Sequence, residues 1–429
     1  MSVDWSERDA AVVWHGFTQM GCYRENSPLI VERAEGRELI DVHGRRYLDA
    51  ISSLWVTTLG HRVPELDAAL REQLDRVAHT TLLGNGNRIV IEFAEALVGV
   101  VPVDEAHVLF ASDGAAAVEQ ALKIAFQYWT NQGIRTRNTY LAFGDAYHGD
   151  TVGGLSLGAG GFGTEIFDPL RFPVLRAPSF SDPAALRSAA AMVLEHADRL
   201  AAVIVEPLVQ GAAGMQTIAA REFAQLQDAC RRTGVLLICD EVATGFGRTG
   251  TLFASEQCGL RPDLLCLGKG ISGGYLPMSA TVANRRVYEA FLGPDLSERT
   301  FYHGHSYGGN ALAAAVALRH LELFQRWDVL ANVRERSAQL RGLFDRHVLP
   351  LGDAVKDIRL IGLMCAVELA GDSSERRLAR RTCAAMVRRG VLARSLGSNI
   401  ILVPPLTITA EEISRIVVTL VEALKEVTA

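Results

Sequence analysis

The sequence predicts an α/β protein with a mostly parallel sheet and a second, smaller α+β domain. Short apolar strands alternate with amphipathic helices through the middle of the chain, which is the pattern of βαβ units. One apolar run, Val235–Cys239, ends abruptly in Asp240 and Glu241, as expected of a buried parallel strand with a carboxylate at its C-terminal edge. Open α/β sheets bind their ligands at that edge.

Each further element is predicted from apolar spacing or from turn residues. The expected elements are a hairpin over 35–46 with glycines at both bends, helices over 64–79, 115–129, 184–196 and 221–233, strands over 107–110, 139–143 and 202–205, one long helix over 310–344, strands within 354–369, and helices over 376–389 and 410–427. Residues 1–60 are expected to contribute to the small domain and the site entrance, 61–320 to form the large domain, and 321–429 to form the small α+β domain.

Composition narrows the class of function. The chain has 429 residues, 49% of them hydrophobic, and a formal net charge of -6 without runs of like charge. This gives no electrostatic reason to expect a nucleic acid or an anionic membrane as partner. The seven cysteines are scattered without a CxxC pair, which indicates reduced thiols. With no signal-like or membrane-spanning run, we expect a cytoplasmic protein that acts on small molecules.

Two residues suggest the chemistry. A carboxylate such as Asp240 can hold a pyridine nitrogen protonated and make the ring an electron sink. Lys269, in an apolar loop between two glycines, can lose its proton and form a Schiff base. Taken alone, Asp240 could equally be a helix cap, and Lys269 a solvated loop charge.

Three loops add to this interpretation. Ser112-Asp113-Gly114-Ala115 joins a strand to a helix, so its free backbone N–H groups can receive a phosphate, although many such turns are small and polar. Tyr147 follows a strand and can lie on a cofactor ring or belong to the core. His303 and His305 have no acid or cysteine beside them, so loop packing or a cofactor contact is favoured over a metal.

In this order, the motifs resemble those of class III aminotransferases of fold type I, across nearly the whole chain. The matching segments are Ser112–Ala115, Tyr147–Gly149, Glu206-Pro207 with Gln210-Gly211, Asp240–Gly250 and Gly268–Gly270. The resemblance implies the pyridoxal phosphate-dependent transferase fold, with a mostly parallel seven-stranded sheet in the large domain. It also implies a homodimer with shared active sites.

The same resemblance assigns roles. Lys269 would be the Schiff-base lysine, Asp240 the partner of the pyridine nitrogen, and Tyr147 the residue stacked on the ring. Ser306 would reach the phosphate of the neighbouring subunit. The full expected set of cofactor-binding residues is Ser112, Asp113, Gly114, Ala115, Tyr147, His148, Glu206, Asp240, Val242, Lys269, His305 and Ser306, with no metal.

Within the class, the chain looks most like the branch that aminates 8-amino-7-oxononanoate in biotin biosynthesis. The residues concerned lie in 14–20, 52–55, 79–84, 126–129, 147–151 and 209–211. Arg394 matches the arginine that takes the acceptor's carboxylate there, and a guanidinium fork suits that group. A surface charge is the alternative for Arg394. The expected substrate-binding residues are Phe17, Trp55, Asp150, Arg248, Gly304 and Arg394.

Departures from the branch pattern concern the amino donor. Members that use S-adenosylmethionine typically have a tandem tryptophan at Leu54-Trp55, a tyrosine at Phe17 and Pro-Thr at His305-Ser306. Lysine is therefore slightly favoured as donor. Gly16 stands where proline is usual. Alternatives are an ω-amine transaminase with another acceptor, an aminomutase or racemase on the same fold, and a cofactor-free binding or scaffold protein.

Overall fold

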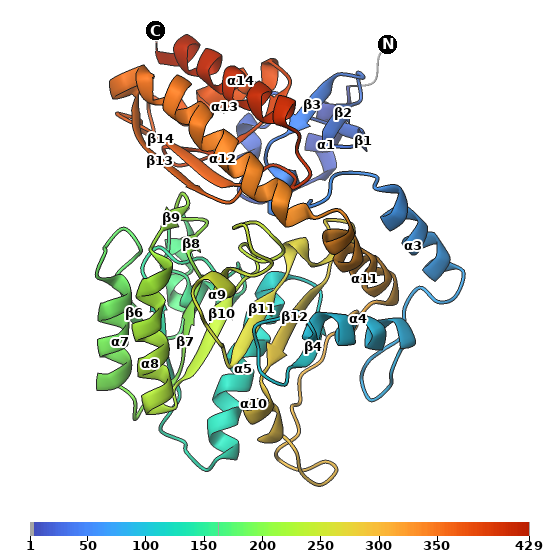
Figure 1. Ribbon diagram of the computed structural model, residues 1–429, viewed down its shortest axis with the longest axis vertical. Coiled ribbons are helices and arrows are strands. Elements are labelled where there is room, and N and C mark those ends of the chain that lie inside the picture. The colour runs from blue at the N-terminus through green and yellow to red at the C-terminus, as the bar shows by residue number, and fades with distance from the viewer. Residues whose placement is uncertain (1–3, 162, 429) are drawn as a thin grey trace.

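A seven-stranded sheet forms the centre of the computed structural model, which describes residues 4–161 and 163–428 (Figure 1). The strands lie in the order β4 (His107–Ala111), β12 (Ser279–Ala283), β11 (Leu264–Leu267), β10 (Leu236–Asp240), β7 (Leu200–Val205), β5 (Thr139–Phe143) and β6 (Leu175–Ala177). Only β12 runs antiparallel to its neighbours in this sheet. The predicted mostly parallel seven-stranded sheet is confirmed.

Alternate residues of β10 face opposite layers of helices. Leu236 and Ile238 pack in the cluster that contains the buried face of α5 (Gly114–Asn131). Leu237 and Cys239 pack in the larger cluster, with α7 (Ala185–Glu195) and α8 (Phe223–Thr233). Because successive strand side chains point to opposite faces and both faces are covered, every residue of β10 is buried. This explains the unbroken apolar run in the sequence.

A smaller α/β part lies above the carboxyl edge of this sheet in Figure 1. It contains the sheet β1 (Val31–Glu35), β2 (Glu38–Asp41), β3 (Arg46–Asp49) and β15 (Val391–Leu392), and the sheet β13 (Val355–Ile361), β14 (Met364–Leu369), β17 (Asn399–Leu402) and β16 (Arg394–Leu396). Helices α12 (Val329–His347), α13 (Leu378–Arg388) and α14 (Ala410–Thr428) accompany them. Strand β3 pairs with β15, so both ends of the chain build one sheet. The domain limits given above stay a prediction.

The predicted single helix over 310–344 is wrong. The structure has two helices there, α11 (Ala311–Arg326) and α12, with Asp328 between them at φ +46°. Aspartate is one of the few residues that tolerate this left-handed conformation, which ends one helix and redirects the chain. The other predicted helices and strands occur within a few residues of their expected limits, except that α3 (Pro64–Leu74) ends earlier than predicted.

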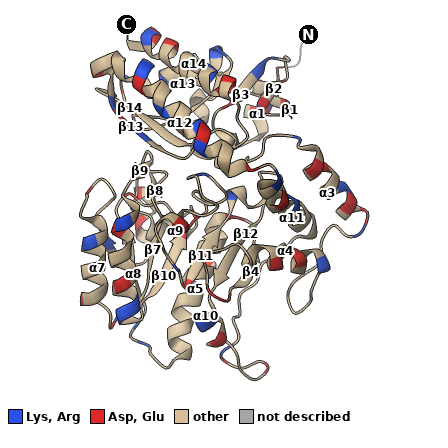
Figure 2. Ribbon diagram, in the orientation of Figure 1, with Lys and Arg blue, Asp and Glu red and all other residues tan. Residues whose placement is uncertain are grey.

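The remaining elements are short or connect the two parts. They are α1 (Trp5–Val12), η1 (Met20–Cys22), α2 (Ser52–Trp55), α4 (Arg88–Val98), α6 (Val152–Leu157), η2 (Thr164–Leu170), β8 (Val209–Gln210), β9 (Gln216–Thr217), η3 (Ala220–Glu222), α9 (Ala254–Gln257), η4 (Lys269–Ser272), α10 (Arg285–Glu289) and η5 (Leu349–Ala354). Figure 2 shows acidic and basic residues intermingled over the outer helices. In the described residues, no helix has the length and apolar character needed to cross a membrane.

Candidate functional site

Loops at the carboxyl ends of five strands converge on one place. Ser112 follows β4, Tyr147 follows β5, Glu206 follows β7, Asp240 ends β10, and Lys269 comes two residues after β11. All five of these strands run in the same direction, and β12, which lies between β4 and β11, runs in the opposite direction. The topology therefore brings together residues that are up to 157 positions apart (269 − 112).

A cavity of about 420 Å³ lies at this point. Predicted site residues make up most of its lining, namely Trp55, Asp113, Gly114, Ala115, Tyr147, His148, Asp150, Glu206, Asp240, Val242 and Lys269. Four further lining residues were not predicted: Gly149, Thr151, Ala212 and Ala243. Gly149 and Thr151 flank Asp150 within the motif 147–151, so their position beside predicted residues was the available signal.

The carboxylate of Asp240 is buried, and two groups contact its oxygens, a histidine ring nitrogen and a backbone N–H. Its Oδ2 lies 2.7 Å from Nδ1 of His148, and its Oδ1 accepts a hydrogen bond from the N–H of Val242 at 3.0 Å. His148 is also buried, and its Nε2 has no hydrogen-bond partner within the described part of the chain. The carboxylate is thus held in one orientation at the cavity wall, where it can accept a hydrogen bond from a protonated ring nitrogen.

The amine of Lys269 faces the same cavity. Desolvation lowers the pKa of Lys269 below its usual value, the nearby Asp240 and Glu206 carboxylates raise it in part, and the Arg248 guanidinium lowers it. A lowered pKa leaves more of the amine neutral near pH 7, and a neutral amine is a nucleophile and a base. The site can therefore form a bond from Lys269 to a carbonyl carbon.

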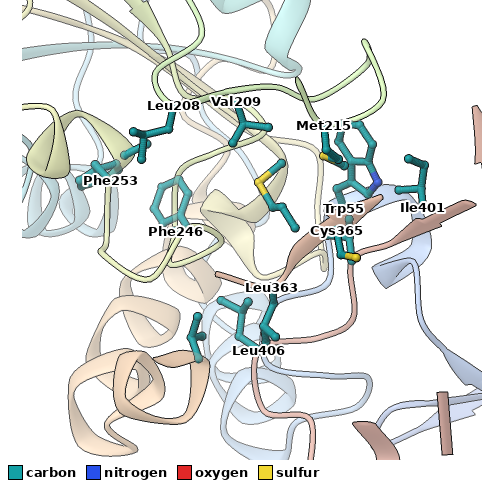
Figure 3. Close-up of a cluster of buried hydrophobic side chains, with 14 of the residues drawn as sticks. Trp55, Leu208, Val209, Met215, Phe246, Phe253, Leu363, Cys365, Ile401 and Leu406 are labelled. Atoms are coloured by element: carbon teal, nitrogen blue, oxygen red, sulfur yellow. The ribbon is translucent and has the colours of Figure 1, made fainter. Parts of the chain in front are cut away.

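Trp55 covers the lysine. Its ring centroid lies 4.9 Å from Nζ of Lys269. Figure 3 shows the indole in a buried cluster beside Met215 and Ile401. The indole Nε1 is buried, and no partner for it occurs in 4–161 or 163–428. The ring excludes water from the amine and leaves one donor available to a ligand.

The first turn of α5 forms an anion-binding cradle. The Asp113 side chain caps the helix by accepting from the N–H of Ala116 at 2.9 Å, which leaves the first N–H groups of the helix, on Gly114 and Ala115, directed toward the cavity end. A Cβ at position 114 would lie 2.5 Å from a methyl carbon of Val242, so only glycine fits there. An 18-residue helix with free N–H groups at a cavity suits a phosphate.

Glu206 and Tyr147 are linked through the backbone. Glu206 accepts from the N–H groups of Tyr147 and Gly211 at 3.3 and 3.2 Å. Burial raises the pKa of Glu206 to about 7, although the nearby His148 lowers this pKa in part. Burial, together with the hydrogen bond that Tyr147 donates to Asp150 at 2.9 Å, raises the pKa of the Tyr147 hydroxyl well above its usual value. Tyr147 is therefore a neutral phenol that orients Asp150.

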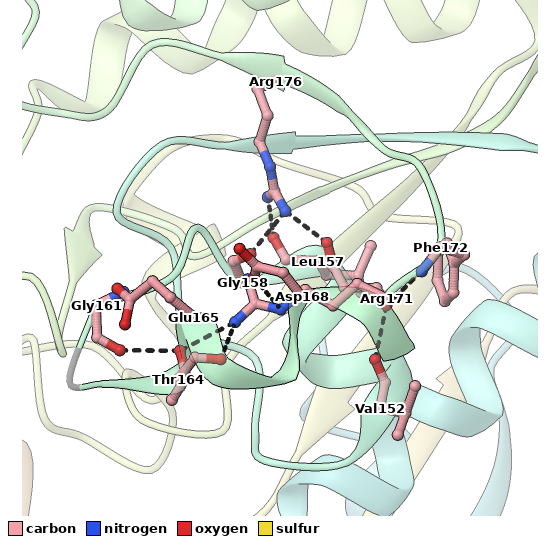
Figure 4. A network of polar contacts seen from close by, with 11 residues as sticks. Val152, Leu157, Gly158, Gly161, Thr164, Glu165, Asp168, Arg171, Phe172 and Arg176 are labelled. Carbon is pink, nitrogen blue, oxygen red and sulfur yellow. Dashed lines mark hydrogen bonds and ion pairs between the residues drawn. The ribbon is translucent and has the colours of Figure 1, made fainter.

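The segment after Asp150 is fixed from its far end. Helix α6 begins directly after Thr151, whose side chain accepts from the N–H of Gly154 at 3.2 Å. At its C-terminal end, the guanidinium of Arg176 donates to the free carbonyls of Ser156, Leu157 and Gly158 (Figure 4). Both ends of α6 thus have partners, which holds the Asp150–Thr151 wall of the cavity in place.

Several predicted residues lie outside this cavity. Phe17 is 62% exposed, and Arg394, at the start of β16, is also exposed. Ser112 stands beside the cavity and donates to Asp113 at 2.9 Å. Arg248 is only 1% exposed and lies behind the wall, where its two terminal nitrogens donate to the carbonyls of Pro404 and Thr57.

The predicted loop Gly304–Ser306 lies at a separate cavity of about 290 Å³ that Gly304 and His305 line. The carbonyl of Ser306 accepts a bond from His79 at 2.7 Å. A group of three or more His, Cys, Asp and Glu side chains that could hold a metal ion does not occur in residues 4–161 and 163–428.

Comparison with known proteins identifies the family. Residues 22–424 match the family described as Aminotransferase class-III. The chain is a class III aminotransferase. An adenosylmethionine-8-amino-7-oxononanoate aminotransferase of Nitratidesulfovibrio vulgaris is 45% identical over 98% of this chain and 81% of its own length. The predicted family, fold type and enzyme class are confirmed.

Two solved structures are similar to this aminotransferase. The adenosylmethionine-8-amino-7-oxononanoate aminotransferase of Methanocaldococcus jannaschii has a TM-score of 0.95 and 37% identity, covering 98% of each chain. An amine transaminase of an uncultivated Pseudomonas species in its PLP-bound form has a TM-score of 0.90 and 32% identity, covering 97% of this chain and 98% of the other. The prediction of pyridoxal phosphate as the cofactor of this family is also confirmed.

Proposed function

We propose that this aminotransferase transfers an amino group to 8-amino-7-oxononanoate and gives 7,8-diaminononanoate (diaminopelargonate) in biotin biosynthesis. One observation carries the chemistry: Lys269, Asp240 and the N-terminus of α5 surround a single cavity, which suits an aldehyde, a pyridine nitrogen and a phosphate respectively. The substrate is supported by the names of relatives that are 37–45% identical to the chain.

The residues present fit pyridoxal phosphate. Bound there, the cofactor would supply a carbonyl group for amines and an electron-withdrawing ring. The amides of Gly114 and Ala115 would hold its phosphate, with Ser112 and Asp113 beside them. Asp240, oriented by His148, would keep the ring nitrogen protonated, with Tyr147 and Val242 against the ring and Glu206 at its edge.

Lys269 would perform two tasks. Its amine would hold the cofactor in the resting enzyme, and when free it would move a proton to and from the reacting carbon of the substrate. The lowered pKa suits both tasks, since each requires the neutral amine. Trp55 keeps water away from this atom, and the raised pKa of Tyr147 keeps its phenol proton on the hydroxyl.

The substrate-binding residues stay predictions. We propose that Arg394 binds the acceptor's carboxylate while Trp55 and Phe17 flank its alkyl chain, and that Asp150, Gly304 and Arg248 complete the pocket. Arg248 would act from behind the wall, because both of its terminal nitrogens are engaged with backbone carbonyls.

We further propose a cytoplasmic homodimer. Gly304, His305 and Ser306 do not line the cavity that contains Lys269 of their own chain, which we call the lysine cavity. This is expected if they serve the site of a second copy. The large exposed side chains of Trp14 and Phe17 near the N-terminus would then be covered on association.

The donor is either lysine or S-adenosylmethionine. The names of the relatives contain adenosylmethionine, whereas Phe17, Leu54 and His305 depart from the pattern of S-adenosylmethionine users. Separate half-reactions with each donor, followed through the visible absorbance of the bound cofactor, distinguish the two. The donor that the enzyme uses should change the visible absorbance of the bound cofactor, and the other donor should leave it unchanged.

Lys269→Ala tests the assignment of the site. The variant is expected to lose turnover and the visible absorbance that the cofactor acquires through the lysine, because Lys269 is the one lysine among the described residues that line the cavity. Lys356→Ala is the matched control, since Lys356 is an exposed lysine on β13 paired with Glu368. A Lys269→Ala enzyme that kept both properties would refute the assignment.

A second candidate is an ω-amine transaminase with another acceptor, which the 32% identical amine transaminase structure favours. A panel of keto and aldehyde acceptors separates the two: preference for 8-amino-7-oxononanoate by kcat/KM supports the first, and preference for a simple ketone supports the second.

A further inference from the structure

The segment that carries Trp55 has an uncommon backbone. Four successive residues other than glycine, Ser52, Ser53, Leu54 and Trp55, have φ values of +50°, +52°, +83° and +68°. The N–H of Trp55 bonds the carbonyl of Ile51 at 2.9 Å, so the segment closes as a left-handed helical turn. L-residues adopt this conformation only where surrounding contacts impose it.

Asp49 supplies the principal contacts. Its side chain is fully buried, and one carboxylate oxygen accepts from the N–H of Ser53 at 3.2 Å and of Ile51 at 3.3 Å. The other oxygen accepts from the Ser53 hydroxyl at 3.1 Å and lies 3.0 Å from Nε2 of His61. One carboxylate therefore binds both the backbone and the side chain of the turn.

The turn has two further attachments on the side of the small domain. The hydroxyl of Ser52 donates to the carbonyl of Val403 at 2.6 Å. Arg248 donates to the carbonyls of Thr57 and Pro404 at 3.0 and 2.7 Å. The Ser52 contact is at the start of the turn, and the Arg248 contacts are beyond its end. Inside the turn, the N–H groups of Leu54 and Trp55 bond the carbonyl of Ile51 at 3.1 and 2.9 Å, and Asp49 bonds the N–H and the hydroxyl of Ser53.

The handedness of the turn determines where the indole goes. A right-handed or extended backbone at 52–55 would direct the side chain at 55 elsewhere, because the side-chain direction follows φ and ψ. In the observed turn, the Trp55 ring lies over Lys269 and passes so near Gly211 that a Cβ there would stand 3.0 Å from the ring.

We propose that Asp49 is a positioning residue that keeps Trp55 over the Lys269 amine by holding the turn Ser52–Trp55 in its left-handed form. The inference rests on the proposed role of Lys269. Asp49 does not line the cavity and acts through Trp55.

The test measures how accessible the lysine is. The chain has only four lysines, and Lys123, Lys356 and Lys425 are exposed, so they serve as internal references for Lys269. Full-length protein freed of cofactor is trace-labelled with acetic anhydride at several pH values, and each lysine is quantified by peptide mass spectrometry. The pH profile yields the rate constant of the neutral amine separately from its pKa.

Asp49→Ala is expected to raise that rate constant for Lys269 on the order of tenfold, because the turn relaxes and the ring leaves the amine. The three reference lysines should not change. Adding Leu54→Gly should restore the low value, since glycine adopts a positive φ without strain. Adding Leu54→Ala instead should not restore it, although it removes the same side chain from a position that is 46% exposed.

A second series keeps Asp49 and therefore does not depend on whether Asp49→Ala folds. Leu54→Val should raise the Lys269 rate constant and lower kcat, because a β-branched residue resists a positive φ, while Leu54→Gly should leave the rate constant unchanged. Equal Lys269 labelling in Leu54→Val, Leu54→Gly and the natural protein, or rescue of Asp49→Ala by Leu54→Ala as well as by Leu54→Gly, overturns the proposal. Labelling needs no substrate, so these results stand apart from any failure of the proposed acceptor.

Discussion

The Nδ1 atom of His148 lies 2.7 Å from Oδ2 of Asp240, and both side chains are buried at the wall of the lysine cavity. Asp240 comes from the last position of β10, while His148 comes from the loop after β5, two strands away across β7. The imidazole therefore fixes the direction of a carboxylate that its own strand only brings to the edge of the sheet.

Asp240→Asn should keep the fold and lower kcat by about 10²–10⁴-fold, because the amide carries no charge to retain a proton on the ring nitrogen. Steady-state kinetics and the circular dichroism spectrum measure the two effects. Asp345→Asn, at an exposed position of α12, is the control. Near-normal turnover in Asp240→Asn would remove Asp240 from the mechanism.

Arg394→Ala should lower kcat/KM of the acceptor half-reaction. The change is expected to correspond to about 1.5–3 kcal/mol of activation free energy, since a charged hydrogen bond to the carboxylate is lost. The donor half-reaction should be nearly unaffected. Single-turnover absorbance changes resolve the halves, and Arg334→Ala, an exposed arginine of α12, provides the baseline. Equal damage to both halves means that the acceptor's carboxylate binds elsewhere.

Glu206 should make the stability of the cofactor-free protein fall as pH rises. Its pKa is 4.5 when exposed and about 7 in the folded chain, so the unfolded state loses the proton first. Stability from this group is then fully present below pH 4.5, declines between 4.5 and 7 by up to about 3 kcal/mol, and is constant above 7. Urea unfolding at a series of pH values measures the effect as the difference between the natural protein and Glu206→Gln. A difference that does not change over this window contradicts the buried environment of the carboxyl group.

Gly149→Ala should both destabilise the protein and weaken cofactor binding. At this position φ is +108°, and a Cβ would stand 2.4 Å from Cβ of Ala115 in the proposed phosphate cradle. Strain and overpacking together predict a loss of at least about 3 kcal/mol. Gly44→Ala separates the two causes, because φ is +79° there but no atom lies within 4 Å of the added carbon, and it should cost only about 1–2 kcal/mol. Thermal unfolding compares the variants, and equal losses would assign the whole effect to backbone strain.

The sequence was sufficient where one local pattern determines one feature. The unbroken apolar run of β10 predicts burial on both faces, and the motifs around Asp240, Lys269 and Gly114 supplied most of the cavity lining. Helix α4 was missed, although Asn87 caps it and Val90, Phe93 and Leu97 form its buried stripe at helical spacing.

Other features depend on contacts between distant segments and could not be predicted. Nothing within Ser52–Trp55 indicates a left-handed turn, because its contacts come from outside the segment: from Asp49, three residues before it, and from Val403 in the distant C-terminal part of the chain. The position of Asp328 between α11 and α12 was hidden within an almost continuous helical pattern. The burial of Arg248 depends on packing between the two parts of the chain, which a single sequence does not reveal.

The pairing of β3 with β15 means that the N-terminal sheet can be completed only after almost the whole chain has been synthesised. Leu48 and Asp49 are synthesised early, but their partners Val391 and Leu392 emerge more than three hundred residues later (391 − 48 = 343). Until then, β3 is an open sheet edge able to pair with other chains. Closing so long a loop is entropically costly and slow. A chain that stops before Val391 would still contain Lys269 and every strand of the central sheet. It would lack β15, the strand that pairs with β3, the strand that ends in Asp49.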